Sequence, residues 1–223
     1  MLQEQIQELT QCYPGLSETD QSKFGVTLSG PVAFEASFGN NEISDVFDVE
    51  MFIPHEFPDA HPVVWEAGCR ISRDFTHVNI DGSFCLAVPL DINEVLSDDP
   101  SLLGFVDKLL VPYLYSYCHW EKFKEMPFGE RSHGAKGYLE YYLDLFNTKN
   151  MNSVLRGVID LLVYGYRPHE KCACGSGKKA LRCHPTESRK IAKSPFKSRM
   201  IWEVRIILDS LESHDKLRVY SDQ

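Results

Sequence analysis

The 223-residue chain has no run of about 18 apolar residues, so we expect no segment that spans a membrane. It also lacks the basic and then apolar start of a secretory signal, because MLQEQIQELT is acidic and amphipathic. Without an export signal, its seven cysteines are expected to be reduced thiols, metal ligands or a nucleophile rather than disulfides. These absences favour a cytoplasmic protein.

Positive charge is scarce in the first two thirds of the chain. Residues 1–150 hold 9 Lys and Arg against 24 Asp and Glu, a net charge of −15, whereas residues 151–223 hold 14 against 8, a net charge of +6. An acidic first part does not suit binding to a phosphate backbone, so nucleic acid is not the expected partner. The basic second part fits either an acidic partner or packing against the first part.

Apolar periodicity predicts an α+β fold in which a helix and an antiparallel meander precede a long loop and several helices. The domains are expected at 1–150 and 151–223, the second a helical tail. Gly30-Pro31 is expected to divide one extended run into two strands joined by a turn. The predicted helices cover residues 2–12, 102–110 (with Ser101 as its N-cap), 135–146, 153–164 and 199–211. The predicted strands cover 26–28, 32–38, 47–53 and 63–65.

The stretch THVNIDGSFCLA, residues 76–87, brings an imidazole, an amide and a thiol close together in sequence. Acyl transfer through cysteine needs a nucleophile, for which Cys85 is the candidate, and donors aimed at the developing oxyanion. Asn79 offers such a donor. His77 is either a base or a brace for the Asp81-Gly82 turn. The alternative is a buried cysteine beside a structural turn.

The surroundings of this stretch resemble the core of ubiquitin-conjugating enzymes. The shared pattern is a strand, a segment rich in proline (FPDAHPVVW, residues 57–65), a His-Pro-Asn tripeptide, a glycine turn and a Cys-Leu pair. In this chain His77-Val78-Asn79 takes the place of the tripeptide, and Cys85-Leu86 takes the thioester position. The resemblance covers roughly residues 24–90 and the helix before them.

This resemblance implies that Cys85 accepts a ubiquitin-like modifier from an activating enzyme as a thioester. The acyl group would then pass to an amine of a target protein, directly or through a ligase. Asn79 would stabilise the oxyanion, and His77 would mainly hold the loop in shape. Because the tetrahedral intermediate is the difficult step, a fixed donor matters more in this reaction than a resident base.

Three departures from the family pattern point to its divergent bacterial members, found in conjugation operons linked to phage defence. Val78 replaces the usual proline, the interval from Asn79 to Cys85 is short, and Ala87 stands where an acidic residue often follows. Three acidic residues could orient or deprotonate an incoming lysine, although an acidic surface loop is the favoured interpretation. They are Asp91, Asp98 and Asp99.

A second cysteine cluster lies in KCACGSGKKALRCHP, residues 171–185. Cys172, Cys174, Cys183 and His184 form a set of soft and borderline ligands that suits tetrahedral Zn²⁺. The spacing and the CGSGKK core resemble the SEC-C motif of the SecA translocase. Since protein groups fill all four ligand places, we expect a closed structural site on a basic docking tail.

Other readings stay open beside the conjugating enzyme: a non-catalytic adaptor of the same fold, a cysteine hydrolase using Cys85, and a tail that binds nucleic acid. A glycine-rich stretch at 127–137, with Arg131 and His133, is either a connector or a mobile loop near the thiol. The remaining cysteines are expected to be buried or half-buried, and the remaining histidines to be structural or solvent-exposed. These are Cys12, Cys69, Cys118, His55, His61, His119, His169 and His214.

Overall fold

A computed structural model describes residues 2–72, 74–87, 89–128, 132, 134–194 and 196–211, without the side chains of residues 89 and 90. The chain divides into two compact units, Met1–Glu130 and Arg131–Gln223. The boundary expected after residue 150 therefore falls earlier in the structure. The helix predicted at 135–146 belongs to the second unit because it packs against later helices.

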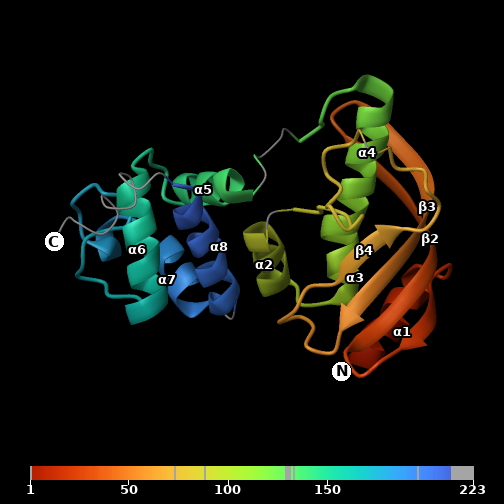
Figure 1. Cartoon of the computed structure of the whole chain (residues 1–223), viewed down its shortest axis with the longest axis horizontal. Helices are drawn as coiled ribbons and strands as arrows, with labels where there is room; N and C mark the ends of the chain where they lie inside the picture. The colour runs from red at the N-terminus through yellow and green to blue at the C-terminus, as the bar shows by residue number, and fades with distance from the viewer. Residues whose placement is uncertain are drawn as a thin grey trace. The chain divides into compact units, whose positions relative to one another are not determined.

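The first unit is a mixed α+β structure built on one antiparallel sheet, as its sequence predicts (Figure 1). The four strands lie in chain order, so each is hydrogen-bonded to its neighbours in sequence. The elements before the helical part are α1 (Leu2–Cys12), β1 (Ser17–Gln21), β2 (Gly25–Phe38), β3 (Asn41–Pro54) and β4 (Val63–Glu66).

Strand β2 runs unbroken through Gly30-Pro31, so the predicted turn at this point is wrong. Both residues pair with β3, where Pro31 lies opposite Asp48. Strand β1 pairs with β2 only as far as Ser29, which leaves β2 a free edge beyond that residue, and a free edge tolerates proline. Gly30 has a φ of 139°, and a Cβ there would collide with the carbonyl oxygen of Gly15. The Gly-Pro pair thus lies just beyond the point where β1 begins to pair with β2, and it does not form a turn.

The helices of the first unit cover one face of the sheet. Ser101 caps the helix that follows it, as predicted, because its hydroxyl accepts a hydrogen bond from the amide of Gly104 at 2.9 Å. From this cap the chain stays helical well beyond the predicted end, and α4 packs against β2 and β3. The helical elements are α2 (Pro89–Asp98), α3 (Leu102–Phe105), the π-helical η1 (Val106–Leu110) and α4 (Val111–Phe123).

Aromatic side chains build much of the core beneath α4. Tyr113, Tyr115 and Tyr117 are buried, and the Phe75 ring packs edge-on against Tyr113 and Tyr117. These three tyrosines of α4 therefore belong to the core of the first unit.

The second unit consists of helices around the cysteine-rich loop. Helix α5 packs against α8 and α6, and α6 packs against α7. Asn150 caps α6 through a hydrogen bond from the Ser153 amide to its side-chain oxygen at 3.1 Å. The elements are α5 (Gly134–Leu145), α6 (Met151–Tyr164), the 3₁₀ turn η2 (Ala180–Arg182), α7 (Pro185–Lys193) and α8 (Lys197–Ser210).

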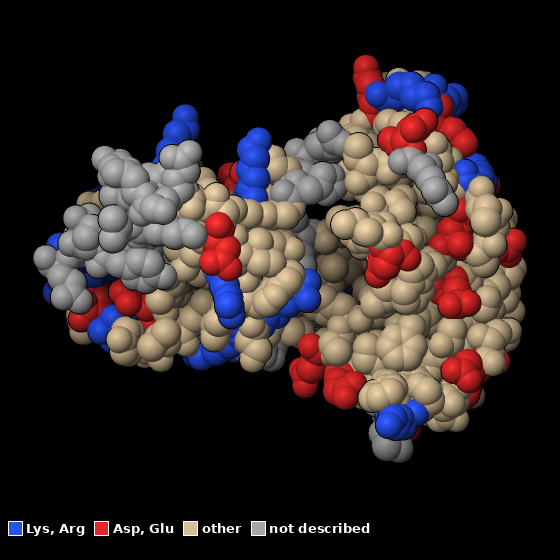
Figure 2. Space-filling model, in the orientation of Figure 1, with Lys and Arg blue, Asp and Glu red and all other residues tan. Residues whose placement is uncertain are grey.

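The two units differ in surface charge, in line with the composition. On the face drawn in Figure 2, acidic side chains are spread over the unit with the sheet, whereas lysine and arginine gather on the unit with α5 to α8. Among the described residues, no helix has both the length and the apolar character needed to cross a bilayer.

One carboxylate is enclosed between the helices of the second unit. Glu203 of α8 is completely buried, and neither of its carboxylate oxygens has a hydrogen-bond partner among the residues that the structure describes. Its ion-pair partner is the half-exposed Arg199, whose Nε lies 3.4 Å from Oε1. Burial raises the pKa of Glu203 to about 7, against the lowering effect of Arg199. The buried hydroxyl of Tyr142 on α5 also lacks a hydrogen-bond partner.

The second unit is therefore expected to lose stability as the pH rises. The folded state holds a proton on Glu203 more tightly than the unfolded state does, so stability falls between pH 4.5 and about 7 and then levels off. The shift corresponds to a loss on the order of 3 kcal/mol. Hydrogen exchange of the α8 amides, corrected for intrinsic rates, measures this loss. Glu203→Gln should remove it, and Asp209→Asn, at an exposed acid on the same helix, should not. An unchanged pH dependence in Glu203→Gln would contradict this assignment.

Candidate functional site

The stretch around the candidate nucleophile folds into a small hairpin with a three-residue loop. The amide of Asn79 donates to the carbonyl of Ser83 at 2.8 Å, and the amide of Gly82 donates to the carbonyl of Asn79 at 2.9 Å. Gly82 takes a φ of 83°, the left-handed conformation that this loop needs at its last residue. The turn predicted from Asp81-Gly82 is thus confirmed.

Backbone pairing brings the three predicted site residues onto one face of this hairpin. Val78 pairs with Phe84, and the Cys85 amide donates to the His77 carbonyl at 2.8 Å. Side chains alternate between the faces of a strand, and directly opposite residues share a face. His77 and Asn79 therefore lie on the same face as Ser83 and Cys85.

The opposite face of the hairpin anchors it to the core. Phe84 is buried, and its ring stacks on Tyr113 of α4 with centroids 4.6 Å apart. The Phe84 amide donates to the Val64 carbonyl in β4 at 2.8 Å, and the Tyr113 hydroxyl donates to the His77 carbonyl at 3.0 Å. Strand β4 and helix α4 thus hold both arms of the hairpin. The His77 ring packs against Phe75 at 5.3 Å.

The carboxamide of Asn79 is solvent-exposed and forms hydrogen bonds within the hairpin. Its Nδ2 donates to the Ser83 hydroxyl at 3.0 Å and, more weakly, to the Phe84 carbonyl at 3.3 Å. Ser83 in turn donates its hydroxyl to the Asp81 carboxylate at 2.6 Å, which lowers the pKa of Asp81. This chain of bonds holds the amide close to the backbone that leads into Cys85.

Cys85 is half-buried, and burial raises the pKa of its thiol above the ordinary value. A half-buried thiol remains reachable by an acyl donor, but only a small fraction of it is ionised at neutral pH. This environment is unlike that of cysteine nucleophiles that a cationic partner keeps ionised.

The acidic residues considered as helpers of an incoming amine lie at the ends of α2 and just beyond it. Asp91 lies in the first turn and Asp98 is the last residue of the helix. Asp99 accepts a hydrogen bond from Ser101 at 2.6 Å and pairs with Lys108 at 2.8 Å. The bond from Lys108 is the main cause of the lowered pKa of Asp99. Through these bonds Asp99 has a structural role at the start of the helix that Ser101 caps.

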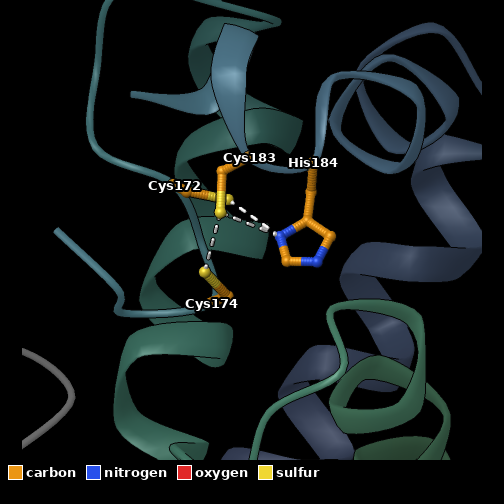
Figure 3. Close-up of side chains that lie close together, drawn as sticks. All are labelled: Cys172, Cys174, Cys183 and His184. Atoms are coloured by element: carbon orange, nitrogen blue, oxygen red, sulfur yellow. Dashed lines mark hydrogen bonds between the residues drawn. The ribbon is translucent and has the colours of Figure 1, made fainter. Parts of the chain in front are cut away.

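The second cysteine cluster converges on one point, as its spacing predicts (Figure 3). The ligand atoms of Cys172, Cys174, Cys183 and His184 all lie within 4.8 Å of one another. His184 presents Nδ1 to the sulfurs of Cys172 and Cys183, at 3.3 and 3.4 Å. Three sulfurs and one imidazole nitrogen form a set that can hold a metal ion such as zinc.

The loop that carries these ligands is shaped by its backbone. The Cys172 amide donates to the Lys178 carbonyl at 2.8 Å, and Gly175 turns the chain with a φ of 78°. Burial opposes ionisation of Cys174, but hydrogen bonds from Ser176 outweigh it and lower the pKa of that thiol to about 6. The Thr148 hydroxyl donates to the Cys174 carbonyl at 3.0 Å, which fixes the loop to the segment before α6.

The prediction that the remaining cysteines are buried is correct for one of them and wrong for two. Cys118 is buried, as expected, but Cys12 and Cys69 are exposed, so the expectation of buried thiols is wrong for these two. Cys12 ends α1 on its solvent side, and Cys69 lies in a turn at a φ of 55°.

The expected structural role of histidine holds for several members of the set. His55 bonds the Ser22 carbonyl at 3.0 Å, His61 bonds Asn93 at 2.6 Å, and His119 bonds the Glu125 carbonyl at 2.9 Å. His169 is exposed. Arg131, His133 and His214 lie outside the described residues.

Two residues that the sequence did not single out support the hairpin. Only the fold reveals the hydrogen bond from the Tyr113 hydroxyl to the His77 carbonyl. Ser83 links Asn79 to Asp81, and its position directly after the predicted turn could have identified it. Compared with known proteins, the chain matches no family model, no curated protein and no solved structure.

The metal cluster predicts near-stoichiometric metal in the purified protein. Elemental analysis should find close to one equivalent, and Cys174→Ser should lose most of it because one of four ligands is gone. Cys12→Ser removes an exposed thiol far from the cluster in sequence and should keep the metal. Equal and low metal contents in all three proteins would refute the site.

Proposed function

We propose that this protein is a ubiquitin-conjugating-like enzyme that carries a ubiquitin-like modifier as a thioester on Cys85. The observation that carries the proposal is the hairpin that sets the half-buried Cys85 thiol and the Asn79 carboxamide on the same face. An antiparallel meander that leads into a cysteine loop and then a long helix agrees with the architecture that the resemblance implies.

Loading is a thiol exchange. The Cys85 sulfur, once deprotonated, attacks the thioester carbonyl on the activating enzyme, a new C–S bond forms, and the sulfur of the activating enzyme leaves as a thiolate. Burial raises the pKa of Cys85, so the free protein holds this thiol mostly protonated. A protonated thiol reacts little while no activating enzyme is bound. The reactivity of the thioester on the activating enzyme must therefore drive loading.

Transfer is an aminolysis in which Asn79 acts at the transition state. An amine nitrogen attacks the thioester carbonyl, negative charge collects on its oxygen, and collapse breaks the C–S bond while the amine loses a proton to solvent. The Asn79 amide can meet the oxyanion by giving up its longer bond, the one at 3.3 Å to the Phe84 carbonyl. Asn79 is exposed, so this rotation displaces only water.

His77 serves in this proposal as a positioning residue and not as a base. Its carbonyl accepts hydrogen bonds from both the Cys85 amide and the Tyr113 hydroxyl. Its contribution therefore comes from the backbone and from ring packing on Phe75. Asp91, Asp98 and Asp99 belong to an acidic surface rather than to the reaction.

The metal in the second unit is proposed to be structural zinc. Three thiolates and an imidazole suit Zn²⁺ better than harder cations, and four protein ligands leave no open position for chemistry. The exposed Lys178, Lys179 and Arg182 in the loop of the cluster then serve to dock an acidic partner.

The implied partners are an activating enzyme, a ubiquitin-like modifier, a target protein and, in some pathways, a ligase. In this proposal, the departures at Val78 and Ala87 favour a divergent bacterial member that acts in a cytoplasmic conjugation pathway linked to antiviral defence. The seven free cysteines fit a reducing compartment.

A cysteine hydrolase is the second candidate, and the environment of Cys85 disfavours it. A hydrolase needs a base or a positive charge that favours the thiolate, whereas burial raises the pKa of this thiol. A non-catalytic adaptor of the same fold would differ from the enzyme only in the reactivity of Cys85. An experiment is therefore needed to distinguish the two.

A peptide thioester that ends in glycine tests the reaction without the natural modifier. Such a probe will acylate Cys85 and also the exposed Cys69, whose adduct serves as an internal uncatalysed reference. Free lysine should discharge the Cys85 adduct about 10²-fold faster than the Cys69 adduct, as a positioned donor predicts. Mass spectrometry of the peptides follows each adduct separately.

The two rivals give different results in the same assay. Equal discharge rates of the two adducts would identify an adaptor. Rapid loss of the Cys85 adduct to water instead of lysine would identify a hydrolase. Cys85→Ser should abolish the fast phase and leave the Cys69 adduct unchanged.

A further inference from the structure

The second unit contains a cavity of about 640 Å³ beside the metal cluster. Its walls are α6, the loop of residues 170–180 and, from α7, Ser188. This volume lies within the range of roughly 300–1,000 Å³ typical of sites for small molecules. The proposed thioester chemistry uses none of these residues, because the whole cavity belongs to the second unit.

The charges around the cavity favour an anion. Arg156 of α6 lines it, together with Arg167 and Lys171 from the segment that follows this helix. Two acids, Asp160 and Glu170, also line it, so the cations exceed the acids by one. The pair of Arg167 and Glu170 is exposed, and its closest atoms are 3.8 Å apart, so it holds Arg167 only weakly.

Two polar atoms in the wall have no hydrogen-bond partner among the described residues. Ser188 is only 1% exposed, and its hydroxyl makes no hydrogen bond. The side-chain oxygen of Asn152 on α6 is buried and also makes none. Buried polar groups are nearly always satisfied in folded proteins, so each of these two can take a partner from the cavity side, either a water molecule or a bound ligand.

The floor of the cavity is shaped by a close approach of two backbones. Gly157 of α6 lies against Ala173 of the metal-binding loop, and a Cβ at residue 157 would collide with Ala173. This contact sets the distance between the helix and the loop. Cys172 belongs to both the cavity wall and the metal cluster, so the metal also determines the shape of this wall.

We propose that this cavity binds a small organic molecule that carries an oxyanion, either a phosphate or a carboxylate. Arginine recognises both groups through paired N–H donors, which Arg156 and Arg167 can supply. The Ser188 hydroxyl and the Asn152 amide meet the uncharged polar part of the ligand. Because the loop and the metal form one wall, binding depends on an intact metal cluster.

The test is a titration of the full-length, metal-loaded protein with inorganic phosphate, with succinate and with uncharged glycerol, at constant ionic strength. NMR spectra of ¹⁵N-labelled protein should show saturable shifts of the Gly157 and Gly175 amides with phosphate, succinate or both, and none with glycerol. Shifts with phosphate alone identify a phosphate ligand, and shifts with succinate alone identify a carboxylate.

Three variants locate the binding. Arg156→Gln should weaken it at least about tenfold, since a charge-assisted bond is lost. Ser188→Ala should weaken it about threefold or more without destabilising the free protein, because the hydroxyl has no partner there. Lys193→Gln, at an exposed site on α7 outside the cavity, should leave it unchanged.

The proposal is overturned if neither anion shifts these amides. It is also overturned if Lys193→Gln weakens binding as much as Arg156→Gln, which would indicate general attraction to a basic surface. These results do not depend on Cys85, so this proposal and the conjugating function fail separately.

Discussion

The carbonyl oxygen of His77 holds the candidate active site together. It accepts one hydrogen bond from the Cys85 amide across the hairpin and another from the Tyr113 hydroxyl of α4. The first bond sets the register that places Asn79 and Cys85 on one face. The second ties that register to the core, where Phe84 stacks on the same tyrosine. A slip of the pairing by one residue would turn the thiol to the opposite face.

Both units bury apolar side chains, but the second also contains a loop that needs another source of stability. The first has a sheet and a set of buried aromatics under α4, enough to form an ordinary apolar core. The loop in the second unit has little apolar material, and its four ligands can replace a core with metal–ligand bonds. The second unit also has buried polar atoms with no hydrogen-bond partner among the described residues, at Glu203 and Ser188. Such groups reduce stability and, in the cavity, are available to a ligand.

The sequence predicted those parts of the fold that depend on local pattern. The hairpin turn at Asp81-Gly82, the Ser101 cap and the metal ligands all follow from residue type and spacing. Strand β1 was missed because SETDQ has no apolar alternation and is fully exposed. The prediction of a turn at Gly30-Pro31 was wrong because the role of this pair depends on where the neighbouring strand β1 begins, which is a tertiary property.

In the candidate site too, the sequence predicted local features but not the tertiary contacts. The composition of residues 76–87 identified the thiol and the amide, but not the tyrosine 28 positions beyond Cys85 that braces them. The elevated pKa of Cys85 could not be read from the sequence either, since it arises from burial. The cavity of the second unit was also missed, because its wall joins residues of α6 with a loop whose shape depends on the metal ligands.

The most direct measurement of the central claim is the rate at which lysine discharges an acyl group from Cys85 when Asn79 is changed. Asn79→Ala and Asn79→Asp both remove the N–H donors, and the second keeps the size of the side chain. Both should slow discharge by about 10²-fold or more, while the Cys69 adduct reacts as before. An unchanged rate in a correctly folded Asn79→Asp protein would contradict the account.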